Sequence, residues 1–91
     1  MAVKVQIPVG LLKMTDNQRF VEVEADDVRR AMDELNILYP GIRDKFYNDD
    51  GSLKGFVRIY VNRKDIRAME GDRTSLSAGD ELILLPALSG G

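Results

Sequence analysis

The last four residues of the sequence, Leu88-Ser89-Gly90-Gly91, are the ones whose types suggest chemistry. Glycine has no Cβ, so a Gly-Gly end adopts nearly any backbone conformation and fits a channel that a side chain would block. A chain needs such an end when its own terminal carboxylate is the reacting group. The ordinary alternative is a frayed terminus, because chain ends are often disordered. We expect the two glycines to be functional.

The rest of the chain offers few catalytic groups, because it contains no His and no Cys. Histidine is the usual general base and zinc ligand, and cysteine is the usual thiolate nucleophile. The run 48–52 superficially resembles a calcium loop. Placing Gly51 at the loop glycine, however, puts Phe46 at the first ligand position and Val57 where the bidentate Glu belongs. We therefore expect a solvated turn there, no metal site, and no enzymatic activity of the chain by itself.

Length and composition predict one small domain. The chain has 91 residues, of which 44% are hydrophobic, and its formal net charge is -2 from 13 basic and 15 acidic residues. That balance provides no basic field for a nucleic-acid backbone. The longest apolar run, 82–88, is far shorter than the roughly 20 residues of a membrane-spanning helix. We expect a cytoplasmic protein with neither nucleic acid nor membrane as a partner.

The first half of the chain predicts two strands and a helix. Alternating apolar residues predict a strand over 3–9 that ends near Pro8, and a second strand over 19–24, paired as an antiparallel hairpin across a loop at 10–18. A helix follows, with Asp26 or Asp27 as its N-cap, and ends before Pro40-Gly41. Its apolar stripe has the spacing of one helix face and consists of Val28, Ala31, Met32 and Leu35.

The second half predicts three strands after a long connection over 42–55. These are a strand over 56–62, a short strand around Ile66-Arg67, and a last strand over 81–85. An irregular crossover over 71–80 carries one candidate for burial, Leu76. Alternation and helical spacing together predict an inward-facing set that includes Val5, Val23, Leu35, Ile59 and Leu84.

The last strand is apolar on both of its faces, although one helix covers only one face of a sheet. If Leu82 and Leu84 face the helix, Ile83 and Leu85 face outward. Phe56 and Tyr60 alternate onto the same outer face, and an exposed apolar patch of this kind usually marks a partner surface. Phe56, Tyr60, Ile83 and Leu85 are therefore the predicted partner-binding residues. The alternative is that the connection over 42–55 covers this patch.

These features resemble the MoaD/ThiS family of ubiquitin-like sulfur carriers, over the whole chain. The strand order, the segment 76–81 before an apolar last strand, and the end 84–91 carry the resemblance. The long middle connection, the strand 56–62 and Asp65-Ile66-Arg67 look closest to the carriers of cysteine biosynthesis. The resemblance implies an α+β, β-grasp fold: a mixed sheet of four to five strands packed on one main helix. Residues 1–85 would form this domain and 86–91 a flexible tail.

The family's chemistry would take place at Gly91. The resemblance implies that an E1-like enzyme adenylates this carboxylate with ATP and Mg²⁺, and that the product becomes a thiocarboxylate. The chain itself would bind no cofactor. Gly90, Ser89 and Leu88 would enter the partner's active site, with Leu88 as an anchor. Six residues from Pro86 onward extend roughly 20 Å at about 3.3 Å each, which is enough to reach a site inside the partner.

The resemblance also implies further partners: a sulfur-accepting synthase, such as a pyridoxal-phosphate-dependent cysteine synthase, and a metalloprotease that releases the product. The final sulfur acceptor stays open among cysteine, methionine, thiamine, molybdopterin, tRNA and others. Two other functions remain open. A ubiquitin-like modifier would join Gly91 to a lysine by an isopeptide bond, and a noncovalent binding module would not need the tail.

Overall fold

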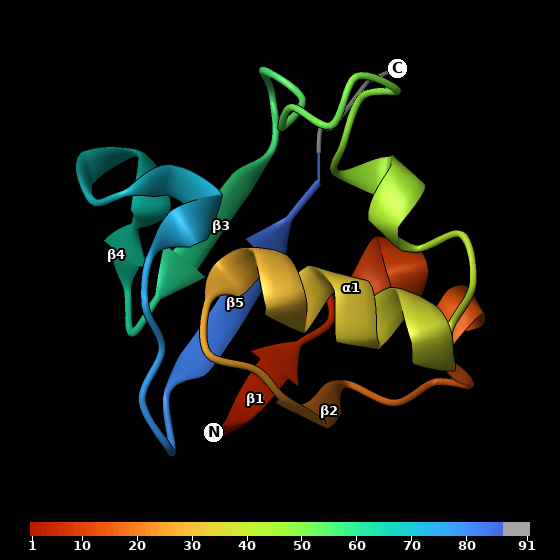
Figure 1. The fold of residues 1–91 in the computed structure, drawn as a ribbon. Helices are drawn as coiled ribbons and strands as arrows, with labels where there is room; N and C mark the ends of the chain where they lie inside the picture. Colours follow the sequence, from red (N-terminus) through yellow and green to blue (C-terminus); the bar gives the residue numbers. More distant parts are fainter. Residues whose placement is uncertain (87–91) are drawn as a thin grey trace.

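Residues 1–86, which the computed structural model describes, form a five-stranded sheet with one α-helix across one face (Figure 1). The strand order is β2-β1-β5-β3-β4. β1 and β5 run parallel, and the other neighbours are antiparallel. The sheet is therefore mixed, as predicted. The strands are β1 (Ala2–Gln6), β2 (Phe20–Glu24), β3 (Arg58–Val61), β4 (Lys64–Asp65) and β5 (Glu81–Leu85).

The β1–β2 hairpin is confirmed, but β1 is shorter than predicted. Ile7 is still buried and its amide donates to the carbonyl of Arg19 at 2.7 Å. Pro8 has no amide hydrogen to continue the ladder, and the chain turns there into a 3-10 helix, η1 (Val9–Thr15). Val9 is 69% exposed, so its predicted place on the buried strand face is wrong. Most of the predicted loop over 10–18 is this 3-10 helix.

The helix α1 (Val28–Leu38) follows its predicted stripe and cap. The Asp27 carboxylate accepts a hydrogen bond from the Arg30 amide at 2.8 Å, which satisfies one of the free donors of the first turn. After the helix, the side-chain oxygen of Asn36 accepts from the amides of Gly41 and Arg43, each at 3.0 Å. All four stripe residues are buried: Val28, Ala31, Met32 and Leu35.

The long connection over 42–55 contributes to the core. Ile42, Phe46 and Tyr47 belong to the same buried cluster as the helix stripe, and a short 3-10 helix, η2 (Arg43–Lys45), lies between them. At the predicted solvated turn, the Asp50 carboxylate accepts from the Ser52 amide at 2.9 Å and from its hydroxyl at 2.6 Å. These hydrogen bonds lower the pKa of Asp50, because they favour its ionised form.

The β3–β4 hairpin differs from the prediction in where its second strand lies. Asn62 and Arg63 form a two-residue turn with φ of 49° and 75°, the left-handed conformation of tight hairpins. Pairing therefore resumes at Lys64, and the short strand predicted around Ile66-Arg67 is wrong. Those two residues begin a 3-10 helix, η3 (Ile66–Ala68), in which Ile66 is buried.

The crossover to β5 is irregular, as predicted. It contains one short 3-10 helix, η4 (Gly71–Arg73), which packs against α1. Leu76 is buried, and its amide donates to the carbonyl of Asp26 at 2.8 Å. This bond and the bridge between Asp27 and Ser75 tie the crossover to the start of the helix.

Candidate functional site

The chain leaves the sheet from its central strand. β5 lies between β1 and β3, and its last residue, Leu85, is paired with Arg58. Pro86 follows, half-buried. The residues predicted to enter a partner's active site, Leu88, Ser89, Gly90 and Gly91, lie outside the described residues. The structure therefore describes Leu85 and Pro86, here called the root of the tail, and the face of the sheet around them.

The sheet face opposite the helix, here the bare face, carries a row of side chains that crosses all five strands. Tyr60 stands directly opposite Ile83, and on its other side pairs with Asp65. Ile83 is also paired with Gln6, which in turn is opposite Phe20. Tyr60 and Ile83 are half-buried, and Phe20 is 50% exposed. The register thus brings two of the predicted partner-binding residues into contact range.

The other two predicted residues lie nearer the root of the tail. Leu85 is 44% exposed and Phe56 is 82% exposed. Phe56 precedes β3 by two residues, in a turn, so the predicted strand start at 56 is two residues early. Because both side chains are exposed, the alternative that the connection over 42–55 covers this patch is wrong.

The bare face becomes charged away from the tail root. Lys4 is paired with Glu22 on one side and with Glu81 on the other. The Lys4 ammonium lies 5.5 Å from the centre of the Phe20 ring, within the range of a cation–π interaction. The face therefore carries its apolar side chains, beside Arg58, at the end where the tail leaves, and it is charged at the opposite end.

The predicted partner-binding set leaves out two members of this face, Arg58 and Phe20. Arg58 lies between Phe56 and Tyr60 and donates from Nη1 to the Val57 carbonyl at 3.2 Å, and its Nε is 3.9 Å from the Asp65 carboxylate. Phe20 alternates with the buried Val21 along β2 and so points away from the core. Its alignment with Gln6 and Ile83, however, depends on strand register across three strands, for which the local sequence carries no signal.

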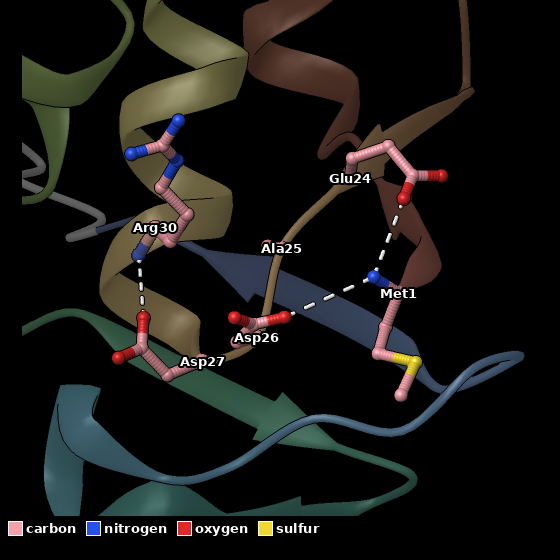
Figure 2. Close-up of a pocket in the computed structure, with 6 residues that line it drawn as sticks. All are labelled: Met1, Glu24, Ala25, Asp26, Asp27 and Arg30. Carbon is pink, nitrogen blue, oxygen red and sulfur yellow. Dashed lines mark hydrogen bonds and ion pairs between the residues drawn. The ribbon is translucent and has the colours of Figure 1, made fainter.

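A polar hollow of about 420 Å³ lies at the opposite end of the sheet and does not compete as a site (Figure 2). It lies beside the chain start, and since β1 runs parallel to β5, the start of β1 lies far from Leu85. Charged groups in this hollow form ion pairs with one another: the Met1 amine lies 3.3 Å from the Glu24 carboxylate and 3.9 Å from that of Asp26. The hollow is lined by Met1, Glu24, Ala25, Asp26, Asp27 and Arg30.

Away from the bare face, the buried phenol of Tyr47 makes a hydrogen bond within the fold. Burial raises the pKa of the Tyr47 phenol, and the nearby Asp72 carboxylate, which accepts its hydrogen bond at 3.1 Å, raises it further. Within this part of the chain, no three His, Cys, Asp or Glu side chains are grouped as metal ligands would be. The same residues include no helix with the length and apolar character needed to span a membrane.

A mixed five-stranded sheet on one helix, with the central last strand leading to a glycine end, defines a ubiquitin-like β-grasp protein. The chain belongs to the ThiS family, whose model matches residues 5–91. It is 36% identical over 93 residues to the sulfur carrier protein CysO of Mycobacterium tuberculosis, with 100% of both chains covered.

Two further comparisons concern a solved structure and a modifier. The chain matches the crystal structure of the Amycolatopsis orientalis BexX/CysO complex with a TM-score of 0.89 and 31% identity, covering 98% of this chain and 99% of that one. It is also 39% identical over 72 residues to small archaeal modifier protein 1 of Haloferax volcanii, with 78% of each chain covered.

Proposed function

We propose that this chain is a sulfur carrier that holds sulfur as a thiocarboxylate on Gly91. The observation that carries the proposal is the full-length similarity to a protein named as a sulfur carrier, in a chain whose sequence ends in Gly90-Gly91. The relatives are named as carriers and modifiers, which supports a role as the substrate of another enzyme.

The proposed chemistry has two steps. An α-carboxyl has a pKa of about 3.3–3.7 and is ionised at neutral pH, and in that form it resists nucleophilic attack. First, a Gly91 carboxylate oxygen attacks the α-phosphorus of ATP and pyrophosphate leaves, which gives an acyl-adenylate. Hydrosulfide then attacks the carbonyl carbon: a C–S bond forms, the C–O bond to AMP breaks, and AMP and a proton are released. ATP and Mg²⁺ are held by the activating enzyme in this scheme.

The bare face supports the proposal by providing a docking surface at the root of the tail. Phe56, Tyr60, Ile83 and Leu85 provide apolar contact area there, and a few central side chains usually dominate binding energy. Residues 88–91 would extend from this surface into the partner's active site, where Gly90 leaves room for a close approach. The solved structure of a CysO in complex with BexX supports an interaction with a partner protein.

The finer proposal is that the sulfur is used for cysteine. Similarity to CysO favours an E1-like activating enzyme, a pyridoxal-phosphate-dependent cysteine synthase as acceptor, and a metalloprotease that releases the product. Purified candidate synthases incubated with the thiocarboxylate form should show transfer of sulfur to only one acceptor. If thiamine or molybdopterin precursors accept the sulfur instead, the assignment to cysteine fails.

The experiment that tests the carrier function measures intact mass. Incubation with the cognate activating enzyme, ATP and sulfide should raise the mass of the chain by one oxygen-to-sulfur exchange. Deletion of Gly91 should abolish the gain, and Gly90→Ala should reduce it, because the added methyl narrows the fit in the channel. Ser89→Ala is the matched control one residue earlier and should leave the gain intact. An unchanged mass of the wild-type chain with a demonstrably active enzyme would overturn the proposal.

The second candidate function is protein modification, which the similarity to small archaeal modifier protein 1 favours. The same acyl-adenylate would then pass, through the conjugation machinery, to a lysine amine and form an isopeptide bond. A ladder of higher-mass conjugates that disappears on deletion of Gly91 would identify this function. Such a ladder together with no thiocarboxylate would favour the modifier over the carrier.

A further inference from the structure

Phe56 is the most exposed large hydrophobic side chain among the described residues, at 82%. It lies in the turn that leads into β3, at the end of the sheet where Leu85 closes β5 (Figure 1). An exposed phenylalanine on a mobile loop would be unremarkable, since surfaces contain many apolar atoms. What distinguishes Phe56 is how firmly its turn is fixed.

The side chain of Arg67 donates hydrogen bonds to the backbone of this turn. A single atom, its Nη2, donates to the carbonyl oxygens of Gly55 at 2.9 Å, Val57 at 3.0 Å and Lys54 at 3.4 Å. These three carbonyls surround Phe56 in the sequence. Nη2 carries only two N–H groups, so one of them is shared between two of the three acceptors.

The turn and the segment that carries Arg67 each have a neighbouring residue buried in the core. Val57, directly after Phe56, is 1% exposed, and its amide donates to the Lys54 carbonyl at 3.3 Å. On the other side, the Asp65 carboxylate accepts from the Arg67 amide at 2.9 Å. The neighbouring Ile66 is 1% exposed. The backbone on both sides of the exposed ring is therefore held, while the ring itself projects into solvent.

We propose that Arg67 is a positioning residue that presents Phe56 as a preformed anchor for an apolar pocket on the activating enzyme. The inference rests on the proposed function, because the occupant is the partner that receives the tail. Two observations favour this partner: the turn adjoins the root of the tail, and it continues the apolar end of the bare face. Fixing a side chain before binding removes part of the ordering cost that association would otherwise carry.

The test is a double-mutant cycle on the full chain, with binding to the cognate activating enzyme measured by calorimetry. Phe56→Ala should weaken Kd roughly tenfold or more, as expected for a central aromatic anchor. Arg67→Ala should weaken Kd roughly threefold to tenfold, the cost of ordering the turn on binding. In the Phe56→Ala background, Arg67→Ala should have little further effect, since a residue that acts through Phe56 has nothing left to position.

Matched variants separate this role from charge and from general stability. Arg73→Ala removes the same charge from an exposed residue of η4, which packs on the helix side, and should leave Kd unchanged. Arg67→Lys keeps the charge at the turn and supplies one nitrogen with three N–H donors, so it should retain most of the affinity that Arg67→Ala loses. In steady state, Arg67→Ala should raise the KM for the carrier and leave kcat unchanged. Faster hydrogen exchange of the Val57 amide should report the loosened turn.

The outcomes that overturn the inference are distinct from failure of the carrier proposal. An equal loss of affinity from Arg67→Ala in both backgrounds would mean that Arg67 contacts the partner directly. Normal affinity of Phe56→Ala, in a chain that still gains sulfur, would refute the anchor while leaving the carrier function in place. If the wild-type chain neither binds the enzyme nor gains sulfur, both proposals fail. If Arg67→Ala does not fold, Arg67→Met, which keeps an apolar stem and removes the donors, takes its place in the cycle.

Discussion

The two faces of the sheet are built from the same strands, yet they differ in exposure. On the helix side, Val5, Ile59 and Leu82 are each at most 2% exposed. On the bare face, the adjacent residues of the same strands include Ile83 and Tyr60, which are half-buried, and Leu85, which is 44% exposed. One face is a packed interior, and the other is open to solvent, with exposed or half-buried apolar side chains near the end of β5.

This difference shows that packing of the domain explains the apolar side chains of the inner face, but not those of the bare face. The helix, together with Ile42 and Phe46 of the connection, covers the inner face. Leu85, by contrast, is 44% exposed, so packing within the domain does not account for its apolar side chain. A contiguous exposed apolar patch usually marks an interaction site. A role in binding, as proposed above, would account for the apolar residues of the bare face.

The largest expected effect is on the inner face. Leu35 is fully buried, so Leu35→Ala should lower the free energy of unfolding by about 2–5 kcal/mol through lost burial and the cavity left behind. Binding to the activating enzyme, measured by calorimetry well below the melting temperature, should not change. A loss of affinity in the folded variant would show that the two faces are energetically coupled.

The bare face should show the opposite pattern. Tyr60→Ala and Ile83→Asp should leave the domain folded and weaken binding to the activating enzyme by about 1 kcal/mol or more each. Ile37→Asp is the matched control, because Ile37 is 69% exposed at the end of α1 and lies off the bare face. Calorimetry beside thermal melts decides the outcome. Unfolding of the first two variants would identify this face as core, and normal affinity would move the docking site elsewhere.

Much of the inner face could be predicted from the sequence, because its signal is local. A strand with one packed face alternates with a period of two, which correctly identified Val5, Val23, Ile59 and Leu84. The helix stripe was equally clear, and Leu35 was placed correctly. The wrong assignments fall where the chain changes direction. Val9 was placed on a strand although the chain turns at Pro8, and the short second strand of the β3–β4 hairpin lies earlier than predicted because its turn is so tight.

The bare face could be predicted only in part, because its organisation depends on contacts between distant segments. Alternation placed Ile83 and Tyr60 outward, but their pairing and their continuation to Phe20 follow from strand register. The hydrogen bonds of Arg67 to three carbonyls that lie ten or more residues away have no sequence pattern that would reveal them. The predicted roles of residues 88–91 lie outside the described part of the chain and stay predictions.

The smallest expected effect on stability comes from shortening the chain end. Every buried residue of the described part lies between Val3 and Leu84, so the core is complete before Pro86. Deletion of Gly90 and Gly91 should therefore change the free energy of unfolding by no more than about 0.5 kcal/mol, the usual range for changes away from a core. Urea unfolding measures this change, since an unaltered slope and midpoint show that neither stability nor buried area has changed.

The same deletion should remove all sulfur loading in the mass assay, because the reacting carboxylate would no longer follow a diglycine. The wild-type chain and Leu35→Ala are the two controls. The melting temperature of the deletion variant should equal that of the wild-type chain. Unlike both controls, the deletion variant should gain no sulfur. If it destabilised the domain as much as Leu35→Ala, the end of the chain would be part of the packed structure. The interpretation of that end as a group delivered into a partner would then fail, and the bare face would need a different occupant.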